Sequence, residues 1–274
     1  QLIWDRATHM KVVIFCGGQG TRLREETEFK PKPMVEIGTR PILWHILKHY
    51  SYYGHREFVL ALGYRGHAIR EYFLNYEPMN SDFTVTIGRD TTVAQHQRHS
   101  DEEWAVTLVE TGLTTTKAGR LAQVRRYVGS DPFMLTYGDA VADVDLNALL
   151  AFHKRHGKLV TFTGVRPRSR FASVEVDGDC VVKSWKEKEQ QREYISGGYF
   201  VCEAAVFDYL DPAVEFEEGP MERLAAEGQV VMFPHDGCWE CMDTYRDYER
   251  LNALWRSHEA AWALWDPSAQ GASL

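Results

Sequence analysis

The feature that most constrains the fold is a short apolar segment that ends in a glycine-rich turn. Residues 12–16 are all apolar, and Gly17-Gly18-Gln19-Gly20 follows them directly. A continuous apolar run of this length, bounded by glycine, is typical of a strand buried on both faces of a parallel sheet. In open α/β sheets, ligands bind beside the carboxyl ends of such strands. The sequence therefore predicts an α/β fold with a candidate site at residues 17–23.

Helical and strand patterns alternate along most of the chain. Apolar residues recur at helical spacing over 41–50, behind a proline that suits a first helical turn, and 58–62 has the pattern of the next strand. This βαβ unit predicts a mostly parallel central sheet flanked by helices. Further helices are expected at 68–76, 119–128, 146–156, 220–227 and 245–255. Further strands are expected at 83–87, 104–109, 133–137, 159–164, 173–176, 181–185, 199–202 and 230–233.

The domain organisation follows from these patterns. Residues 10–265 are expected to form a single domain, in which 10–164 make the α/β part and 165–265 a smaller, more antiparallel region. Residues 1–9 precede Met10 and have the character of an expression-vector remnant, and 266–274 form a tail. Between Gly88 and Gly119 the chain turns polar, which indicates an excursion that carries one strand and mobile flanks.

Charge and composition restrict the partners. The chain has 31 basic and 39 acidic residues and a formal net charge of −8, which argues against binding to nucleic acid or to an anionic membrane. It contains no run of about 18 apolar residues that could cross a membrane and no apolar signal core, so a cytoplasmic location is expected. The five scattered cysteines are expected to be reduced thiols. A phosphate ligand would therefore need a local cluster of cations.

The glycine-rich segment has the chemistry of a phosphate loop. Its glycines let the backbone turn N–H groups toward phosphate oxygens, and Arg22 adds a forked cation. A P-loop would close with Gly-Lys-Ser/Thr, and a dinucleotide loop would have a third glycine where Leu23 stands, so an NTPase and an NAD-dependent dehydrogenase are poor interpretations. For the glycines alone, a plain tight turn is an equal alternative.

The next segment, Lys30-Pro31-Lys32-Pro33-Met34, strengthens the phosphate interpretation. Each proline fixes its own φ and favours an extended conformation in the lysine before it. Because an extended backbone repeats every two residues, Lys30 and Lys32 are expected to project the same way. A stiff segment so soon after the loop would place an ammonium group near a triphosphate at small entropic cost.

At this point the motifs resemble a known family. Gly17-Gly18-Gln19-Gly20-Thr21-Arg22-Leu23 and Lys32-Pro33-Met34 resemble the opening pattern of the sugar-1-phosphate nucleotidylyltransferases. Within that family the nearest resemblance is to the glucose-1-phosphate cytidylyltransferases, through 30–38, 41–46, 63–64 with 71–73, and 239 with 242–244. The resemblance implies a Rossmann-like nucleotidyltransferase fold, with nucleotide bound by 10–164 and sugar phosphate by 165–265.

The resemblance also implies an activity. Its members join a nucleoside triphosphate and a sugar 1-phosphate by direct in-line attack at the α-phosphorus, which here means CTP and glucose 1-phosphate giving CDP-glucose and pyrophosphate, with Mg²⁺ as cofactor. The same reaction with UTP, dTTP or another sugar phosphate is an alternative, since no single residue specifies cytosine. A catalytically weak nucleotide sensor or partner subunit is a second alternative. The resemblance further implies a homo-oligomer, such as a hexamer, with the segment after Gly88 near a subunit boundary.

The expected site residues fall into three groups. Lys32, Arg22 and Asp139 are assigned to catalysis, and Asp139 with Asp243 to Mg²⁺, which takes one or two protein carboxylates. From the residues alone, Asp139 is a turn residue and Asp243 is an N-cap. Nucleotide binding is assigned to Gly17, Gly18, Gly20, Thr21, Arg22, Lys32 and Arg120. Sugar-phosphate binding is assigned to Tyr137, Glu187, Lys188, Ser196, Gly197 and Gly198.

Departures from the family pattern concentrate on the sugar side. They are Ala140 and Ala172 in place of glycine, Glu189 in place of proline and Ser196 in place of asparagine. Such changes alter pocket volume and hydroxyl contacts, so the identity of the sugar phosphate stays open.

Two other signals are discounted. Cys238-Trp239-Glu240-Cys241 has the spacing of half a zinc site, but a single pair without a second one is expected to be ordinary buried thiols. Trp255, Trp262 and Trp265 are expected to pack the last helix or a subunit contact.

Overall fold

The computed structural model describes residues 9–167, 172–186 and 193–270. Its main sheet contains β1 (Lys11–Cys16), β4 (Glu57–Leu62), β7 (Ala105–Glu110), β8 (Phe133–Tyr137), β10 (Val160–Val165), β13 (Ile195–Ser196), β14 (Phe200–Cys202) and β15 (Val230–His235). Four small ladders pair β2 (Glu36–Ile37) with β3 (Arg40–Pro41), β5 (Ser81–Thr86) with β6 (Thr92–Arg98), β9 (Ala140–Ala142) with β16 (Trp239–Cys241), and β11 (Ser173–Val176) with β12 (Val182–Lys186). The α-helices are α1 (Arg24–Thr27), α2 (Ile42–Tyr52), α3 (Gly66–Leu74), α4 (Tyr76–Met79), α5 (Lys117–Val128), α6 (Leu146–His156), α7 (Pro220–Ala226) and α8 (Tyr245–Arg256).

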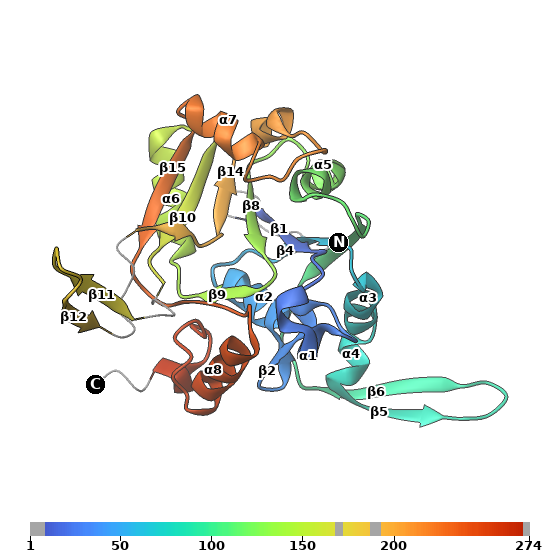
Figure 1. Cartoon of the computed structure of the whole chain (residues 1–274). Helices are drawn as coiled ribbons and strands as arrows, with labels where there is room; N and C mark the ends of the chain where they lie inside the picture. The colour runs from blue at the N-terminus through green and yellow to red at the C-terminus, as the bar shows by residue number, and fades with distance from the viewer. Residues whose placement is uncertain (1–8, 168–171, 187–192, 271–274) are drawn as a thin grey trace.

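The main sheet has a parallel centre. Strand β1 pairs in parallel with β4 on one side and β8 on the other, and β7 extends the parallel set beyond β4. Strand β14 runs antiparallel between β8 and β10, and β15 runs parallel to β10. This mixed sheet with helices on its faces confirms the α/β class predicted from sequence (Figure 1).

The central strands are buried on both faces, as their unbroken apolar runs predict. Val13 and Phe15 face α5 and α7, whereas Ile14 and Cys16 face α2, α6 and α8. Each large side chain removed from water contributes about 1.5–3 kcal/mol to folding. The two faces together fix β1, and the loop that follows it, at the centre of the molecule.

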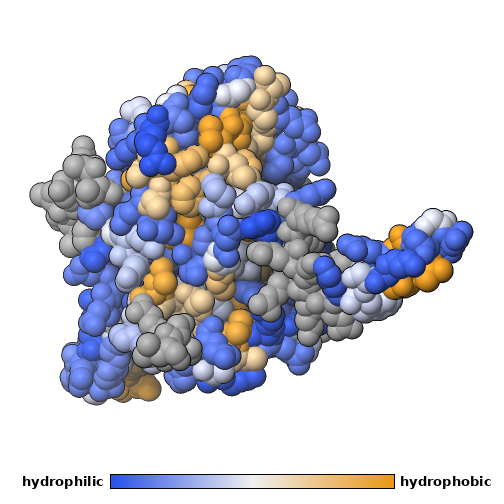
Figure 2. All heavy atoms as spheres, turned by 90° about the vertical axis from the view of Figure 1, so that its left-hand side faces the viewer, coloured by the Kyte–Doolittle hydropathy of each residue, from blue (hydrophilic) through white to orange (hydrophobic). Residues whose placement is uncertain are grey.

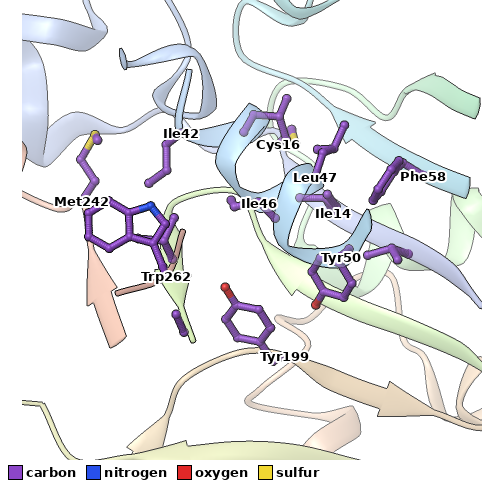
Figure 3. Packing of buried hydrophobic residues seen from close by; sticks show 14 of the residues in the cluster. Ile14, Cys16, Ile42, Ile46, Leu47, Tyr50, Phe58, Tyr199, Met242 and Trp262 are labelled. Atoms are coloured by element: carbon purple, nitrogen blue, oxygen red, sulfur yellow. The ribbon is translucent and has the colours of Figure 1, made fainter. Parts of the chain in front are cut away.

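The segment after α8 closes one face of the core. Met242, Trp262 and Ile42 lie against one another beside α2 (Figure 3). The ring of Trp255 meets the buried His45 ring edge-on, with centroids 4.7 Å apart. All three tryptophans near the C-terminus pack on this cluster or within it, so the expected packing role is confirmed.

The region after α4 departs from the sequence prediction. The strand expected at 83–87 lies outside the main sheet: it is part of β5, which pairs with β6, a strand the polar composition had hidden. Together they form an arm that projects from the body (Figure 1). The strand predicted at 104–109 as part of an excursion is β7, which belongs to the main sheet. In β5, apolar Phe83 and Val85 alternate with polar residues, a pattern that suits an exposed hairpin. The more apolar segment Ala105–Glu110 suits a strand at the edge of the main sheet.

A second hairpin, β11–β12, also stands away from the body and carries exposed hydrophobic side chains (Figure 2). It confirms the strands expected at 173–176 and 181–185. Within the part of the chain that the structure describes, no helix is long and apolar enough to cross a membrane. The five cysteines are all free thiols.

Candidate active site at the carboxyl edge of the sheet

A cavity of about 500 Å³ opens where β1 and β8 end. Its walls come from the glycine-rich loop after β1, the Lys32 turn, the loop before α5 and the segment after β8. The lining residues are Phe15, Cys16, Gly17, Gly18, Gln19, Gly20, Thr21, Arg22, Lys32, Pro33, Leu113, Thr114, Thr115, Lys117, Arg120, Tyr137, Gly138, Asp139, Glu215 and Asp243. All seven residues assigned to nucleotide binding therefore line one cavity, at the place open α/β sheets use for ligands.

The glycine-rich loop presents free backbone donors to this cavity. The N–H groups of Gly18, Gln19 and Gly20 donate to no acceptor within residues 9–167, 172–186 and 193–270. Gly20 has a φ of +62°, a conformation that favours glycine. A Cβ added to Gly18 would meet no atom within 4 Å, so Gly18 leaves open space for a ligand. Successive free N–H groups of this kind form a concave site for anions.

Lys32 projects into the cavity and contacts two carboxylates. Its Nζ lies 2.8 Å from Asp139 Oδ2 and 2.5 Å from Asp243 Oδ1. Burial lowers the pKa of Lys32, but the charge of Asp139 and the hydrogen bonds to both aspartates outweigh it, so the net shift is upward. The ammonium group therefore stays charged at neutral pH.

Lys30 does not project with Lys32 as predicted. Its Nζ lies 3.9 Å from Glu26, toward the outside of the site. The difference arises because residues 32–34 form a 3₁₀ turn after an extended Pro31, which breaks the two-residue repeat. Only one of the two lysines reaches the cavity.

Asp139 and Asp243 are 104 positions apart in sequence, and the β9–β16 ladder brings them together. Ala140 pairs with Cys241 in that ladder, and Met242 N donates to Asp139 O at 2.9 Å. Asp243 is not an N-cap: Thr244 caps α8 through a capping box with Asp247. The carboxylate of Asp243 is thereby left to face Lys32 and Arg22.

This carboxylate pair suits a hard divalent cation. One donor atom from each of Asp139, Cys241 and Asp243 lies within 4.8 Å of the other two. Two carboxylates match the oxygen donors that Mg²⁺ takes from proteins. Burial, reinforced by both aspartates, raises the pKa of the Cys241 thiol well above its usual range.

Arg22 stands at the rim of the cavity. Its side chain is 76% exposed, and Nη1 donates to Asp243 Oδ2 at 3.1 Å. Thr21 is also exposed beside it. A solvated guanidinium held by one carboxylate is free to turn toward a ligand.

Arg120 is held differently, because its guanidinium lies in the wall. Nη1 donates to Leu62 O, Thr111 Oγ1 and Gly112 O at 2.9, 2.6 and 2.8 Å, and Nη2 donates to Gly17 O at 3.2 Å. The residue is only 5% exposed. Arg120 thus ties the start of the glycine-rich loop to the loop before α5.

The sugar-side residues are placed less completely. Tyr137 lines the cavity, donates to Glu217 Oε1 at 2.6 Å, and has a pKa raised by burial and by Glu217. Gly198 has φ of +78° and lies against the Tyr137 ring, where a Cβ would come within 3.0 Å. Ser196 and Gly197 are outside the cavity lining, in and just after β13. Glu187, Lys188 and Glu189 lie outside the described residues.

Several cavity residues were missed from sequence. Lys117 contacts Glu217 at 2.7 Å, and Glu215 and residues 113–115 complete the same wall. The position of Lys117, two residues before Gly119-Arg120-Leu121, was the available signal. Cys241 had been discounted with its CxxC spacing.

Comparison with known proteins gives consistent results. The sequence profile described as nucleotidyl transferase matches residues 11–251. The glucose-1-phosphate cytidylyltransferase of Salmonella typhi is 45% identical over 94% of this chain and 100% of its own length. The mannose-1-phosphate guanyltransferase of Schizosaccharomyces pombe is 27% identical over 90% of this chain and 65% of its own.

The fold has solved neighbours as well. The crystal structure of HddC from Yersinia pseudotuberculosis superposes with a TM-score of 0.62, over 89% of this chain and 98% of that one. Its sequence is 19% identical, so the likeness concerns the fold alone.

Proposed function

The chain belongs to the nucleotidyl transferase family, and from this premise we propose that it transfers the cytidylyl group of CTP to glucose 1-phosphate, giving CDP-glucose and pyrophosphate. The observation that carries the proposal is 45% identity to a glucose-1-phosphate cytidylyltransferase over the whole length of that relative. The cavity, with free loop amides on one side and Lys32 on the other, supports it. In the proposal, residues 10–265 act as one domain, in the cytoplasm.

The reaction needs no nucleophile from the protein. A phosphate oxygen of glucose 1-phosphate attacks the α-phosphorus of CTP, the new O–P bond forms, and the bond to the β-phosphate oxygen breaks to release pyrophosphate. The protein must hold two polyanions together and offset the charge that develops at phosphorus. Lys32 supplies a charge beside the reacting phosphate, and Arg22 supplies another from the rim.

The glycine-rich loop would bind the triphosphate through its free N–H groups, since these donate to phosphate oxygens without a change of backbone conformation. Thr21 lies at the end of this loop. Asp139 and Asp243 would hold Mg²⁺, which when bound offsets negative charge on the phosphate oxygens. Lys32 contacts both carboxylates, so it is positioned to exchange them for a phosphate oxygen.

Arg120 acts through the wall that it braces. Its guanidinium fixes the carbonyls of Gly17, Leu62 and Gly112, so the loop before α5 presents residues 113–115 to the nucleotide in one arrangement. On the sugar side, the proposal assigns Tyr137, Ser196, Gly197 and Gly198 together with Glu187 and Lys188 to the sugar phosphate.

The test is a matrix of nucleoside triphosphates against sugar 1-phosphates, read by pyrophosphate release with Mg²⁺. We expect CTP with glucose 1-phosphate to give the highest kcat/KM. A higher value with UTP, dTTP or GTP, or with another sugar, would replace the assigned substrates. Nucleotide binding without pyrophosphate release for any pair would instead indicate a sensor.

The proposal includes a homo-oligomer, with a hexamer as the expected assembly. The β5–β6 arm leaves Phe83, Val85, Ile87 and Val93 between 42% and 87% exposed, which is unusual apolar exposure for an isolated chain. Light scattering of the wild type and of Val85→Asp with Val93→Asp, a cross-strand pair, tests it. The expected result is a smaller mass for the variant only.

The matched control is Val176→Asp with Val182→Asp, the cross-strand pair on the other hairpin, which should leave the mass unchanged. A monomeric wild type, or equal loss of mass in both variants, would remove the arm from the assembly.

A further inference from the structure

The thiol of Cys241 is the one donor in the aspartate cluster that the proposed reaction does not use. It lies with the carboxylates of Asp139 and Asp243, one donor atom from each residue being within 4.8 Å of the other two. Among the residues that the structure describes, this is the one cluster of three or more His, Cys, Asp or Glu side chains with metal-ligand spacing. The cluster is partly buried, between the Lys32 turn and the β9–β16 ladder.

The ladder explains why Cys241, and not Cys238, joins the aspartates. Cys241 ends β16 opposite Ala140, directly after Asp139. Side chains three positions apart in an extended strand point to opposite faces. Cys238 lies just before β16, packs against the core cluster that contains Tyr199, and is not among the donors grouped with the aspartates. The CxxC spacing is therefore not a metal motif, although one of its members stands in a metal-ligand cluster.

The donor set decides which cations can use the cluster fully. Mg²⁺ takes oxygen ligands and has little affinity for sulfur, so it would use only the two carboxylates. Zinc-class cations accept carboxylate and thiolate together, at about 2.0–2.3 Å. A cation of that class gains a third protein ligand here, and the thiol releases its proton to solvent as the metal–sulfur bond forms.

Lys32 marks the position that such a cation would take. Its ammonium group contacts both aspartates, at 2.8 and 2.5 Å, so a positive charge already occupies the space between the carboxylates. A divalent cation bound by all three donors would displace Lys32 from that position. Magnesium bound by the carboxylates would compete for the same two oxygens.

We infer that Asp139, Cys241 and Asp243 form a three-donor site for a soft divalent cation of the zinc class, which competes with Mg²⁺ at the active site. This inference rests on the proposed function, because it takes the aspartate pair as the metal ligands. The sulfur of Cys241 gives the site a preference for zinc-class cations over Mg²⁺ that two carboxylates alone would not have.

The experiment uses Cd²⁺ as the probe, because a cadmium–thiolate bond gives an ultraviolet charge-transfer absorbance. It is made in a Cys180→Ser background, since Cys180 is the exposed thiol. One equivalent of Cd²⁺ should produce the band, and excess Mg²⁺ should weaken the apparent Cd²⁺ affinity. Cys238→Ser, the matched control, should keep the band.

Cys241→Ser should lose the band and reduce Cd²⁺ affinity by about tenfold or more. Persistence of the band in Cys241→Ser, or no competition by Mg²⁺, would overturn the inference. Circular dichroism of each variant checks that the fold is retained.

Mn²⁺ binding, followed by electron paramagnetic resonance, separates this failure from failure of the proposed function. Mn²⁺ prefers oxygen ligands as Mg²⁺ does, so it should bind Cys241→Ser like the wild type and bind Asp139→Asn at least about tenfold more weakly. Unchanged Mn²⁺ binding in Asp139→Asn would remove the aspartates as metal ligands. Normal Mn²⁺ behaviour with a persistent cadmium band in Cys241→Ser would remove only the role of Cys241.

Discussion

Among the cations that line the cavity, Lys32 and Arg120 are held by the protein in different ways. Lys32 contacts the carboxylates of Asp139 and Asp243, which a metal ion could take from it. Arg120 donates to backbone carbonyls and one hydroxyl, none of which any ligand of the cavity could replace. Lys32 can therefore exchange its partners when a ligand binds, whereas Arg120 is a fixed structural part of the cavity wall.

One site can therefore combine reaction chemistry with a rigid wall. An ammonium group paired with carboxylates can transfer its contacts to phosphate at small cost, since one anion replaces another. A buried guanidinium bonded to neutral acceptors cannot leave without exposing unsatisfied carbonyls. Loss of Lys32 should therefore affect turnover, whereas loss of Arg120 should affect stability.

The largest expected effect is that of Lys32→Ala on the rate. Removal of a cation that offsets charge at the reacting phosphorus should lower kcat by about 10²–10³-fold, or about 3–4 kcal/mol in activation free energy. The urea midpoint should stay near that of the wild type. Lys30→Ala, on the same proline-rich segment but paired with Glu26, should keep the wild-type rate. A wild-type rate in Lys32→Ala would contradict a role for Lys32 in offsetting charge at the reacting phosphorus.

The next effect is that of Arg120→Ala on the free energy of unfolding. The carbonyls of Leu62 and Gly112 would lose their donor inside the wall, which should cost about 2–3 kcal/mol. Urea unfolding measures it. Arg125→Ala on the same helix, whose Arg125–Asp208 pair is largely exposed, should change stability by less than about 1 kcal/mol. Equal effects of the two variants would contradict a structural role for Arg120.

The dependence of the unfolding free energy on pH distinguishes the contribution of Lys32 and its two aspartates from that of the buried histidines His45 and His49 on α2. Burial lowers the pKa of His45 and of His49 from 6.5 to about 4, so both are neutral in the folded protein. The unfolded chain takes up their protons first, and stability is therefore lost as pH falls from 6.5 toward 4. Each of these two histidines should lower the free energy of unfolding by about 1 kcal/mol as the pH falls from 7.5 to 5.5.

The variant His49→Gln should remove only its own share, about 1 kcal/mol, of the stability lost between pH 7.5 and 5.5, because His45 still titrates. Lys32→Ala should leave the slope as it is, because the carboxylates raise the pKa of Lys32 and it remains charged throughout. A slope that decreases in Lys32→Ala and is unchanged in His49→Gln would place the acid sensitivity in the active site.

The smallest effect concerns the cap beside Asp243. Thr244→Ala removes the hydroxyl that accepts from Asp247 N and should lower the free energy of unfolding by about 0.5–1 kcal/mol. Turnover should change little, since Asp243 is held through Lys32 and Arg22. Ser257→Ala, at the other end of α8, should be close to neutral. A large loss of turnover in Thr244→Ala would show that the cap also positions the carboxylate.

Much of the site could be predicted because its chemistry is local in sequence. The apolar run of β1, its glycines and the lysine–proline segment lie within 24 residues. Strand β1 and its glycine-rich loop follow from backbone preferences, whereas the 3₁₀ turn at Lys32–Met34 was not predicted. The pairing of Asp139 with Asp243 came from the resemblance alone, since a contact across 104 positions depends on the β9–β16 register. The same register places Cys241 beside the aspartates. The CxxC spacing could not predict this, because spacing in sequence does not tell which side of a strand faces Asp139 and Asp243.

The arm and the buried arginine show where sequence patterns mislead. The β6 strand is exposed along its whole length, and its two apolar residues, Val93 and Ala94, are adjacent and do not alternate with polar ones, so periodicity did not reveal it. Arg120 was predicted to contact the nucleotide, yet its guanidinium donates to carbonyls of three segments that only the fold brings together: the loop after β1, the end of β4 and the loop before α5. Tertiary contacts decided both outcomes.

The account is tested most directly by a crystal structure of the protein with Mg²⁺ and CTP. It predicts that the Lys32 ammonium group contacts a phosphate oxygen of the nucleotide, while Arg120 still donates to Leu62 O and Gly112 O. A nucleotide bound away from Lys32 and Asp139, with Lys32 still paired to both aspartates, would contradict it.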